Sequence, residues 1–207
     1  MTLNEFIAGF LGASFIEIVA SISGFICVFL LIKRNIWNFA FGFVQVALFS
    51  WVFFQNKLYS DAVLHVIYIG LQIYGWYNWT HHRTTQKSVI IELTPLKNIL
   101  GWSLLCVFTT AAVGFTMHTY TDASFPYPDA FTTCASLIAQ WLMTRRQIFN
   151  WVLWIIVDIV AIAIYLQKGL FPTSILYVCF LIMSCVGLYS WMREYNLQKE
   201  TKMLDTQ

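Results

Sequence analysis

Charged residues are scarce in this chain. They make up 11% of its 207 residues, whereas a typical soluble domain has about 25%. Hydrophobic residues make up 59%, and the mean hydropathy is +0.67. So few charges cannot cover a water-facing surface, and the composition therefore excludes an ordinary soluble globular domain. We expect an integral membrane protein whose main surroundings are the lipid bilayer, and we expect no nucleic-acid partner.

Motifs of common enzymes are also missing. The sequence contains no phosphate-binding loop of the GxxxxGK[ST] type, no HExxH and no GxSxG. The chain has four His and five Cys but no CxxC pair, and all five cysteines lie inside apolar runs. We interpret the cysteines as small buried apolar residues. The sequence predicts neither an enzyme, nor a bound metal, nor a cofactor.

Seven apolar segments approach the roughly 20 residues that a helix needs to cross a bilayer. Helices are expected because lipid cannot satisfy free backbone polar groups. The fold class is therefore all-α, a polytopic integral membrane protein with seven transmembrane helices. The segments cover residues 14–32, 36–54, 58–79, 98–117, 129–143, 149–167 and 170–192.

Basic residues are distributed unevenly over the connections between these segments. Because positive residues are retained in the cytoplasm, the side with more of them is the inner side. Ten of the twelve Lys and Arg fall on one side, and only Lys57 and Lys168 fall on the other. This bias places the N-terminus outside and the C-terminus in the cytoplasm. The ten are Lys33, Arg34, Arg83, Lys87, Lys97, Arg145, Arg146, Arg193, Lys199 and Lys202.

The first three segments resemble the last three when the sequence is shifted by 112 residues without a gap. Polar and Trp identities carry the match; they include Arg34 with Arg146, Asn38 with Asn150, and Trp79 with Trp191. An offset of four segments gives both halves the same direction, hence a 3+1+3 parallel repeat of the kind found in small transporters. The expected parts are a first three-helix repeat (1–79), a loop with linker helix (80–128), a second repeat (129–192) and a cytoplasmic tail (193–207).

The sixth segment carries the clearest candidate for a solute site. Trp151, Trp154 and Asp158 follow one another at helical spacing, and Asp158 falls near mid-depth. Carboxylates in a membrane span are costly and are functional candidates by default. Two indoles and a carboxylate suit a flat cationic ring or a ribose-type sugar. An interfacial aromatic belt with a helix-bridging Asp158 is the structural alternative.

Other segments carry polar faces that could line the same cavity or could instead bridge helices. The third segment has a stripe of His65, Tyr68, Gln72, Trp76 and Trp79, and the second has Gln45 at mid-depth. The fifth segment contributes Gln140, and Tyr177 shares a face of the seventh with Ser184. By contrast, Glu17 and Asp129 lie near outer helix starts, where the helix dipole favours an anion without any function. The predicted substrate-binding set is Trp151, Trp154, Asp158, Gln45, His65, Tyr68, Gln72, Gln140 and Tyr177.

Four stretches together resemble the PnuC family of nicotinamide riboside transporters. They are IYGWYNW (73–79), LMTRR (142–146), NWVLWIIVD (150–158) and GLYSWMR (187–193). The resemblance covers nearly the whole chain. It implies seven helices in a 3+1+3 arrangement similar to SWEET sugar transporters, in a bacterial inner membrane. It also implies that Trp151, Trp154 and Asp158 contact the substrate.

The resemblance further implies facilitated diffusion of nicotinamide riboside, with a cytoplasmic kinase trapping the solute for NAD synthesis. Other members of the family carry thiamine or riboflavin, and both remain alternative substrates. A proton- or sodium-coupled symporter that uses Asp158 or His65 is a second class. A membrane sensor or binding subunit is a third class. Whether the chain forms a homo-oligomer is left open by the sequence.

Overall fold

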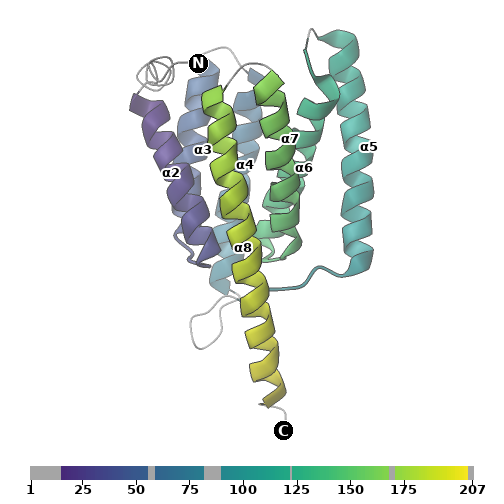
Figure 1. Ribbon diagram of the computed structural model, residues 1–207. Coiled ribbons are helices and arrows are strands. Elements are labelled where there is room, and N and C mark those ends of the chain that lie inside the picture. The colour runs from purple at the N-terminus through teal and green to yellow at the C-terminus, as the bar shows by residue number, and fades with distance from the viewer. Residues whose placement is uncertain (1–14, 56–58, 82–89, 122, 168–170, 205–207) are drawn as a thin grey trace. The chain divides into compact units, whose positions relative to one another are not determined.

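The computed structural model describes residues 15–55, 59–81, 90–121, 123–167 and 171–204, and these residues form seven helices (Figure 1). Five of the helices are long and apolar enough to cross a membrane, whereas α4 and α6 are more polar. All seven overlap the predicted segments. They are α2 (Phe15–Ile32), α3 (Asn38–Gln55), α4 (Tyr59–His81), α5 (Leu96–Tyr120), α6 (Pro126–Thr144), α7 (Phe149–Gln167) and α8 (Phe171–Leu204).

Two helix boundaries differ from the sequence-based expectation. Helix α6 begins at Pro126, three residues before the predicted start, because a proline is well tolerated in the first turn, where no backbone donor is needed. Helix α8 has 34 residues and continues twelve residues past the predicted end. At 1.5 Å per residue it is about 51 Å long, well beyond the roughly 30 Å of a hydrocarbon core. Figure 1 shows it extending beyond α6 and α7.

The chain divides into two compact units, Met1–Val89 and Ile90–Gln207. In the first unit, α3 packs against both α2 and α4. Glycines allow these close approaches: Gly24 on α2 faces the Gln45 side chain, and Gly75 on α4 faces the Phe39 ring. A Cβ atom at Gly24 would lie 2.8 Å from Gln45 Nε2, so any larger residue there would displace the amide.

In the second unit the helices pack in chain order, α5 on α6, α6 on α7 and α7 on α8. Its apolar core contains small residues of α6 that allow α5 and α7 to approach closely. The buried members are Cys106, Cys134, Ala135, Ile138, Ala139, Leu142, Leu153 and Val157. The linker helix α5 is therefore part of the second unit.

The cysteines partly contradict their predicted burial. All five are free thiols, and Cys27, Cys106 and Cys134 are buried as expected. Cys179 and Cys185, however, are exposed on α8. In a membrane-spanning helix an apolar run marks the side chains that face lipid as well as those that face the core. Position in an apolar run therefore did not decide burial.

Local geometry recurs at an offset of 112 residues. Arg34 and Arg146 lie in the turns that follow α2 and α6, each two residues after the end of its helix, and have φ angles of 56° and 60°. The Asn38 amide donates to the Asn35 carbonyl over 2.7 Å, and the Asn150 amide donates to the Gln147 carbonyl over 2.6 Å. Asn38 and Asn150 are both fully buried. The same helix–turn–helix joint is thus built twice.

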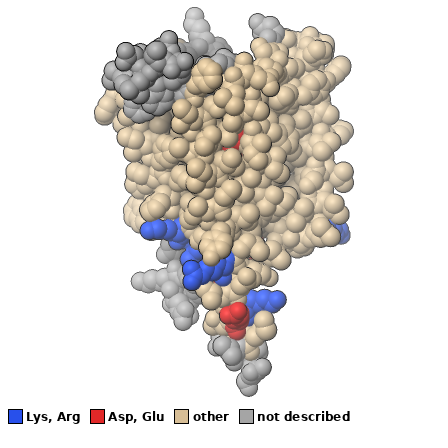
Figure 2. Space-filling view, viewed as in Figure 1, with Lys and Arg blue, Asp and Glu red and all other residues tan. Residues whose placement is uncertain are grey.

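Charged residues on α8 are confined to its last third. The part from Phe171 to Met192 has none, and Arg193, Glu194, Lys199, Glu200 and Lys202 follow. Figure 2 shows Lys, Arg and acidic side-chain atoms toward the C-terminal end of α8, and one small patch of Asp or Glu atoms within the tan surface above them. This division agrees with a membrane-spanning part followed by an aqueous one. Among the basic residues used in the sequence prediction, Lys57, Arg83, Lys87 and Lys168 lie outside the described residues.

Candidate functional site

The contact between α7 and α8 contains the predicted Asp158. Ser184 Oγ donates a hydrogen bond to Asp158 Oδ2 over 3.1 Å, and both side chains are buried. The carboxylate lies mid-way along α7, and its neighbours on that helix are apolar. A buried carboxylate with one hydroxyl donor keeps most of its capacity to accept hydrogen bonds. It can therefore still accept a hydrogen bond from a solute or balance a solute's positive charge.

Below this pair, the same two helices are joined by aromatic packing. Trp151 lies across Gly187, where a Cβ atom would be 2.5 Å from the ring. Its ring also meets Trp191 edge to face, with centroids 5.6 Å apart and planes at 85°. We name Trp151, Asp158, Ser184, Gly187 and Trp191 the second seam. It has aromatic packing at one level and a polar pair at another.

The three residues predicted for one face of the sixth segment have different surroundings. Trp151 is 1% exposed, and its ring is packed between Gly187 and Trp191. Its indole nitrogen has no hydrogen-bond partner among the described residues. Trp154 is half-buried and packs against the core that α5, α6 and α7 share. The structure therefore brings Trp151 and Asp158 to α8, and it directs Trp154 to the other side of α7.

The first unit has an equivalent contact between α3 and α4. The Phe39 ring meets Trp79 edge to face at 5.0 Å and 86°, and it lies against Gly75. One level further along, the Gln72 amide lies against Gly42, and Gln72 Oε1 has no hydrogen-bond partner among the described residues. We name Phe39, Gly42, Gln72, Gly75 and Trp79 the first seam. Its polar group is a neutral amide.

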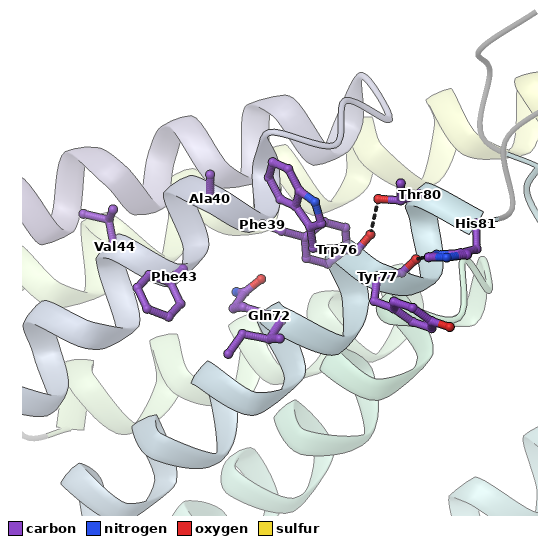
Figure 3. Close-up of a pocket in the computed structure, with 10 residues that line it drawn as sticks. Phe39, Ala40, Phe43, Val44, Gln72, Trp76, Tyr77, Thr80 and His81 are labelled. Carbon is purple, nitrogen blue, oxygen red and sulfur yellow. Dashed lines mark hydrogen bonds between the residues drawn. The ribbon is translucent and has the colours of Figure 1, made fainter.

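Gln72 also opens onto a groove with a volume of about 650 Å³ between α3 and α4 (Figure 3). Figure 3 shows its side chain directed from α4 toward α3, with Phe43 and Val44 at one end of the groove and Thr80 and His81 at the other. Apart from Gln72, the polar side chains stand at the His81 end. The lining residues are Phe39, Ala40, Phe43, Val44, Gln72, Ile73, Trp76, Tyr77, Thr80 and His81.

Most other predicted site residues lie in aromatic clusters toward the opposite ends of these helices. His65 packs edge-on to Phe53 at 4.9 Å and to Tyr68 at 5.8 Å. Tyr177 on α8 lies 5.2 Å from Tyr165 on α7. His65 and Tyr68 are thus together, and Tyr177 is in a cluster of its own in the second unit.

Two predicted amides remain. Gln45 packs against Gly24 of α2, away from the first seam. Gln140 on α6 is 7% exposed, and its Nε2 has no hydrogen-bond partner among the described residues. A buried amide with an unused donor is costly, so Gln140 is a candidate for a solute or water contact. It remains a prediction from sequence.

The sequence reasoning did not include Ser184 in the substrate-binding set, nor Gly187, nor the residues that line the groove apart from Gln72. One sequence signal could have pointed to Ser184. Applying the 112-residue offset to Gln72 gives Ser184, and applying it to Gly75 gives Gly187. Among the described residues, no group of three His, Cys, Asp or Glu side chains is placed to hold a metal ion.

These features agree with a comparison to known sequences. The chain matches the family model described as "Nicotinamide mononucleotide transporter" over residues 14–193, and it therefore belongs to that family of membrane transporters. The predicted resemblance is thus confirmed. Membership of a family of bacterial transporters, together with the apolar helices, identifies a multi-pass protein of the bacterial inner membrane, not an enzyme.

Individual relatives carry different solutes according to their names. A nicotinamide riboside transporter PnuC from Escherichia coli (strain K12) is 29% identical, over 89% of this chain and 88% of its own. The riboflavin/roseoflavin transporter RibM from Streptomyces davaonensis is 24% identical, over 84% and 83%. A solved structure titled "Crystal structure of the Vitamin B3 transporter PnuC" is 26% identical, with a TM-score of 0.74, and covers 92% of this chain and 86% of that one.

Proposed function

We propose that this chain carries nicotinamide riboside into the cell by facilitated diffusion. The buried carboxylate of Asp158, held by Ser184 within an apolar helix pair, carries the proposal. A pyridinium ring is positively charged, and a ribose has two adjacent hydroxyl donors. Either group suits a carboxylate that has unused acceptor capacity. Relatives named as nicotinamide riboside transporters support the choice of solute.

The transport mechanism that we propose uses a 3+1+3 parallel repeat with the N-terminus outside and the C-terminus in the cytoplasm. The recurring joints at Arg34 and Arg146 support the repeat, and the ten-to-two bias of basic residues supports the orientation. In this proposal the solute moves down its own gradient, and the lack of a phosphate-binding loop for ATP is consistent with that. A cytoplasmic kinase would then trap it, because a phosphate group prevents its return.

The experiment that tests the solute is a titration of intrinsic Trp fluorescence in purified protein. The chain has nine Trp, so a bound aromatic solute should alter the signal. Nicotinamide riboside, thiamine and riboflavin are added separately, and uptake into sealed liposomes is then measured for each binder. Saturable binding and uptake of nicotinamide riboside support the proposal. If only riboflavin or thiamine binds, the solute assignment is wrong, and if binding occurs without uptake, the chain is a sensor or binding subunit.

Coupling to a proton gradient is a second candidate, because Asp158 is a buried carboxylate in a membrane-spanning helix. In liposomes with equal solute on both sides, an imposed pH gradient would then drive net accumulation. Facilitated diffusion predicts no accumulation under these conditions. Asp158→Asn keeps the shape of the side chain and removes the titratable group, so it should abolish any pH-driven accumulation.

A further inference from the structure

A short segment before α5 runs against the turn between α6 and α7. The Glu92 amide donates to the Arg146 carbonyl over 3.0 Å, and the Ile148 amide donates to the Glu92 carbonyl over 3.1 Å. These two bonds pair Glu92 with Gln147 as in a parallel β-ladder. We name residues 91–94 the strap. Its backbone is fixed to the end of α6 and to the residues that lead into α7.

Side chains reinforce this contact. The Arg146 guanidinium donates to Glu92 Oε1 over 3.0 Å, with the Arg146 side chain 6% exposed and that of Glu92 48% exposed. Thr94 Oγ1 lies 3.4 Å from Gln147 Oε1. Removal of the Glu92 carboxylate would take away this contact from a guanidinium that is largely buried, which is unfavourable. The ion pair therefore favours the closed contact over a released one.

The strap also reaches α8. The Ile91 amide donates to Gln198 Oε1 over 3.1 Å, and Gln198 Nε2 donates to Glu194 Oε1 over 3.2 Å. Ile91 and Thr94 are both buried. Gln198 lies in the part of α8 that continues beyond membrane length, so this extension has a structural partner. One segment of four residues thus contacts the ends of α6 and α7 and the extension of α8.

We propose that the strap locks α5, α6, α7 and α8 into one rigid body during transport. Pro95 caps α5 immediately after the strap, so the linker helix begins where the strap ends. Any rearrangement that exposes the solute site to one side and then the other would leave the packing of α5, α6, α7 and α8 on one another unchanged. This inference rests on the proposed transport function. In it, helix α5 moves together with α6, α7 and α8.

A reversible cross-link tests whether the strap must release. Thr94→Cys and Gln147→Cys are introduced together after the five native cysteines are replaced, so that Glu92 and Arg146 stay intact. Uptake of nicotinamide riboside, thiamine and riboflavin into liposomes is measured before and after oxidation, and again after reduction. A rigid strap predicts that oxidation changes uptake by less than about twofold. A loss of tenfold or more that reductant restores would overturn the proposal.

A second measurement tests the lock without transport. In hydrogen–deuterium exchange, Glu92→Gln should speed exchange at residues 91–94 and 145–149 together. Glu200→Gln, an exposed site on the same α8 extension, is the matched control and should change neither segment. Unchanged exchange in Glu92→Gln would contradict the lock. If no form of the protein takes up any of the three solutes, the proposed function fails, and the exchange result still decides the strap.

Discussion

The two seams share a packing scheme and differ in their chemistry. In the first seam Phe39 fits between Gly75 and Trp79, and in the second Trp151 fits between Gly187 and Trp191. The ring planes meet at nearly the same angle, 86° and 85°. At the next level the first seam holds a neutral amide, Gln72, and the second a serine–carboxylate pair.

Comparing the two seams separates the residues that hold the helix pair together from those that are available for function. Glycine and aromatic residues recur in both seams because a helix pair needs a close approach at that level. The carboxylate does not recur: the position of Asp158 corresponds to the apolar Val46, whereas Ser184 corresponds to another polar residue, Gln72. The carboxylate is therefore not needed to build a seam, and we expect it to act on the solute.

The largest expected effect comes from removing the carboxylate. Asp158→Ala should raise the Kd for nicotinamide riboside by about tenfold to a hundredfold, the cost of losing a charge-assisted contact. The equivalent change in the first unit, Val46→Ala, and the change Glu17→Gln in the first turn of α2 should leave Kd within about twofold. Fluorescence titration measures all three. Equal losses for Asp158→Ala and Glu17→Gln would contradict the site assignment.

Substitution of the glycines in the two seams should have the next largest effect, on the stability of the fold and not on solute binding. Gly187→Ala should lower stability by about 1–3 kcal/mol, because its Cβ would overlap the buried Trp151 ring. Gly75→Ala should behave alike against Phe39. Gly70→Ala and Gly101→Ala, where no atom lies within 4 Å of the new Cβ, should instead gain about 0.5–1 kcal/mol. Thermal unfolding in detergent measures these changes. If Gly70→Ala lowered stability as much as Gly187→Ala, the packing explanation would be wrong.

A substitution at Gln72 can distinguish a role in solute binding from a role in stability. Gln72→Leu keeps the volume and removes a buried oxygen that has no partner among the described residues, so stability should hold or rise. If that oxygen accepts from the solute, Kd should rise by about tenfold. Titration and thermal unfolding of the same variant distinguish the two roles. Lower stability with unchanged Kd would make Gln72 a purely structural residue.

A smaller effect is expected at Ser184, which acts through Asp158. Ser184→Ala removes the hydroxyl donor and frees the carboxylate to turn, so the Kd should rise by about threefold. Ser174→Ala, at another buried serine of α8, is the matched control. In the Asp158→Ala background Ser184→Ala should add nothing further. An additive loss in the double variant would mean that Ser184 contacts the solute independently.

The smallest effect concerns the two joints. Arg34→Gly should gain about 0.5–1 kcal/mol of stability from the backbone alone, because the Arg34 φ of 56° lies in the left-handed region that favours glycine. Arg146→Gly gains the same backbone relief and loses the ion pair with Glu92, so its net effect should be a loss. Thermal unfolding compares them. A gain in both variants would show that the Glu92 ion pair contributes little to stability.

The sequence was sufficient for the helices. Apolar runs of nearly membrane-spanning length locate all seven, including the more polar α4 and α6. It was not sufficient for the end of α8, because a charged segment that continues a helix resembles a tail that does not. The strap could not be predicted from the sequence either, because a four-residue segment that pairs with a turn has no hydrophobic periodicity.

The candidate site was predictable only in part. Helical spacing places Trp151, Trp154 and Asp158 on one broad face of α7. A face of that width can contact two neighbouring helices. The structure turns Trp151 and Asp158 to α8 and Trp154 to the core around α6. Which neighbour a residue meets depends on the small residues opposite it. Gly187 decides this for Trp151, and a single sequence does not pair residues across helices.

The positive φ angles of the arginines at the two joints have a consequence for which substitutions a selection would favour there. The backbone at position 34 favours glycine, whereas a basic residue helps to orient the chain as it enters the membrane. A selection for heat resistance and a selection for correct insertion would therefore prefer different residues at position 34. Arg146 differs, because its ion pair with Glu92 gives the same kind of side chain a role in the finished fold.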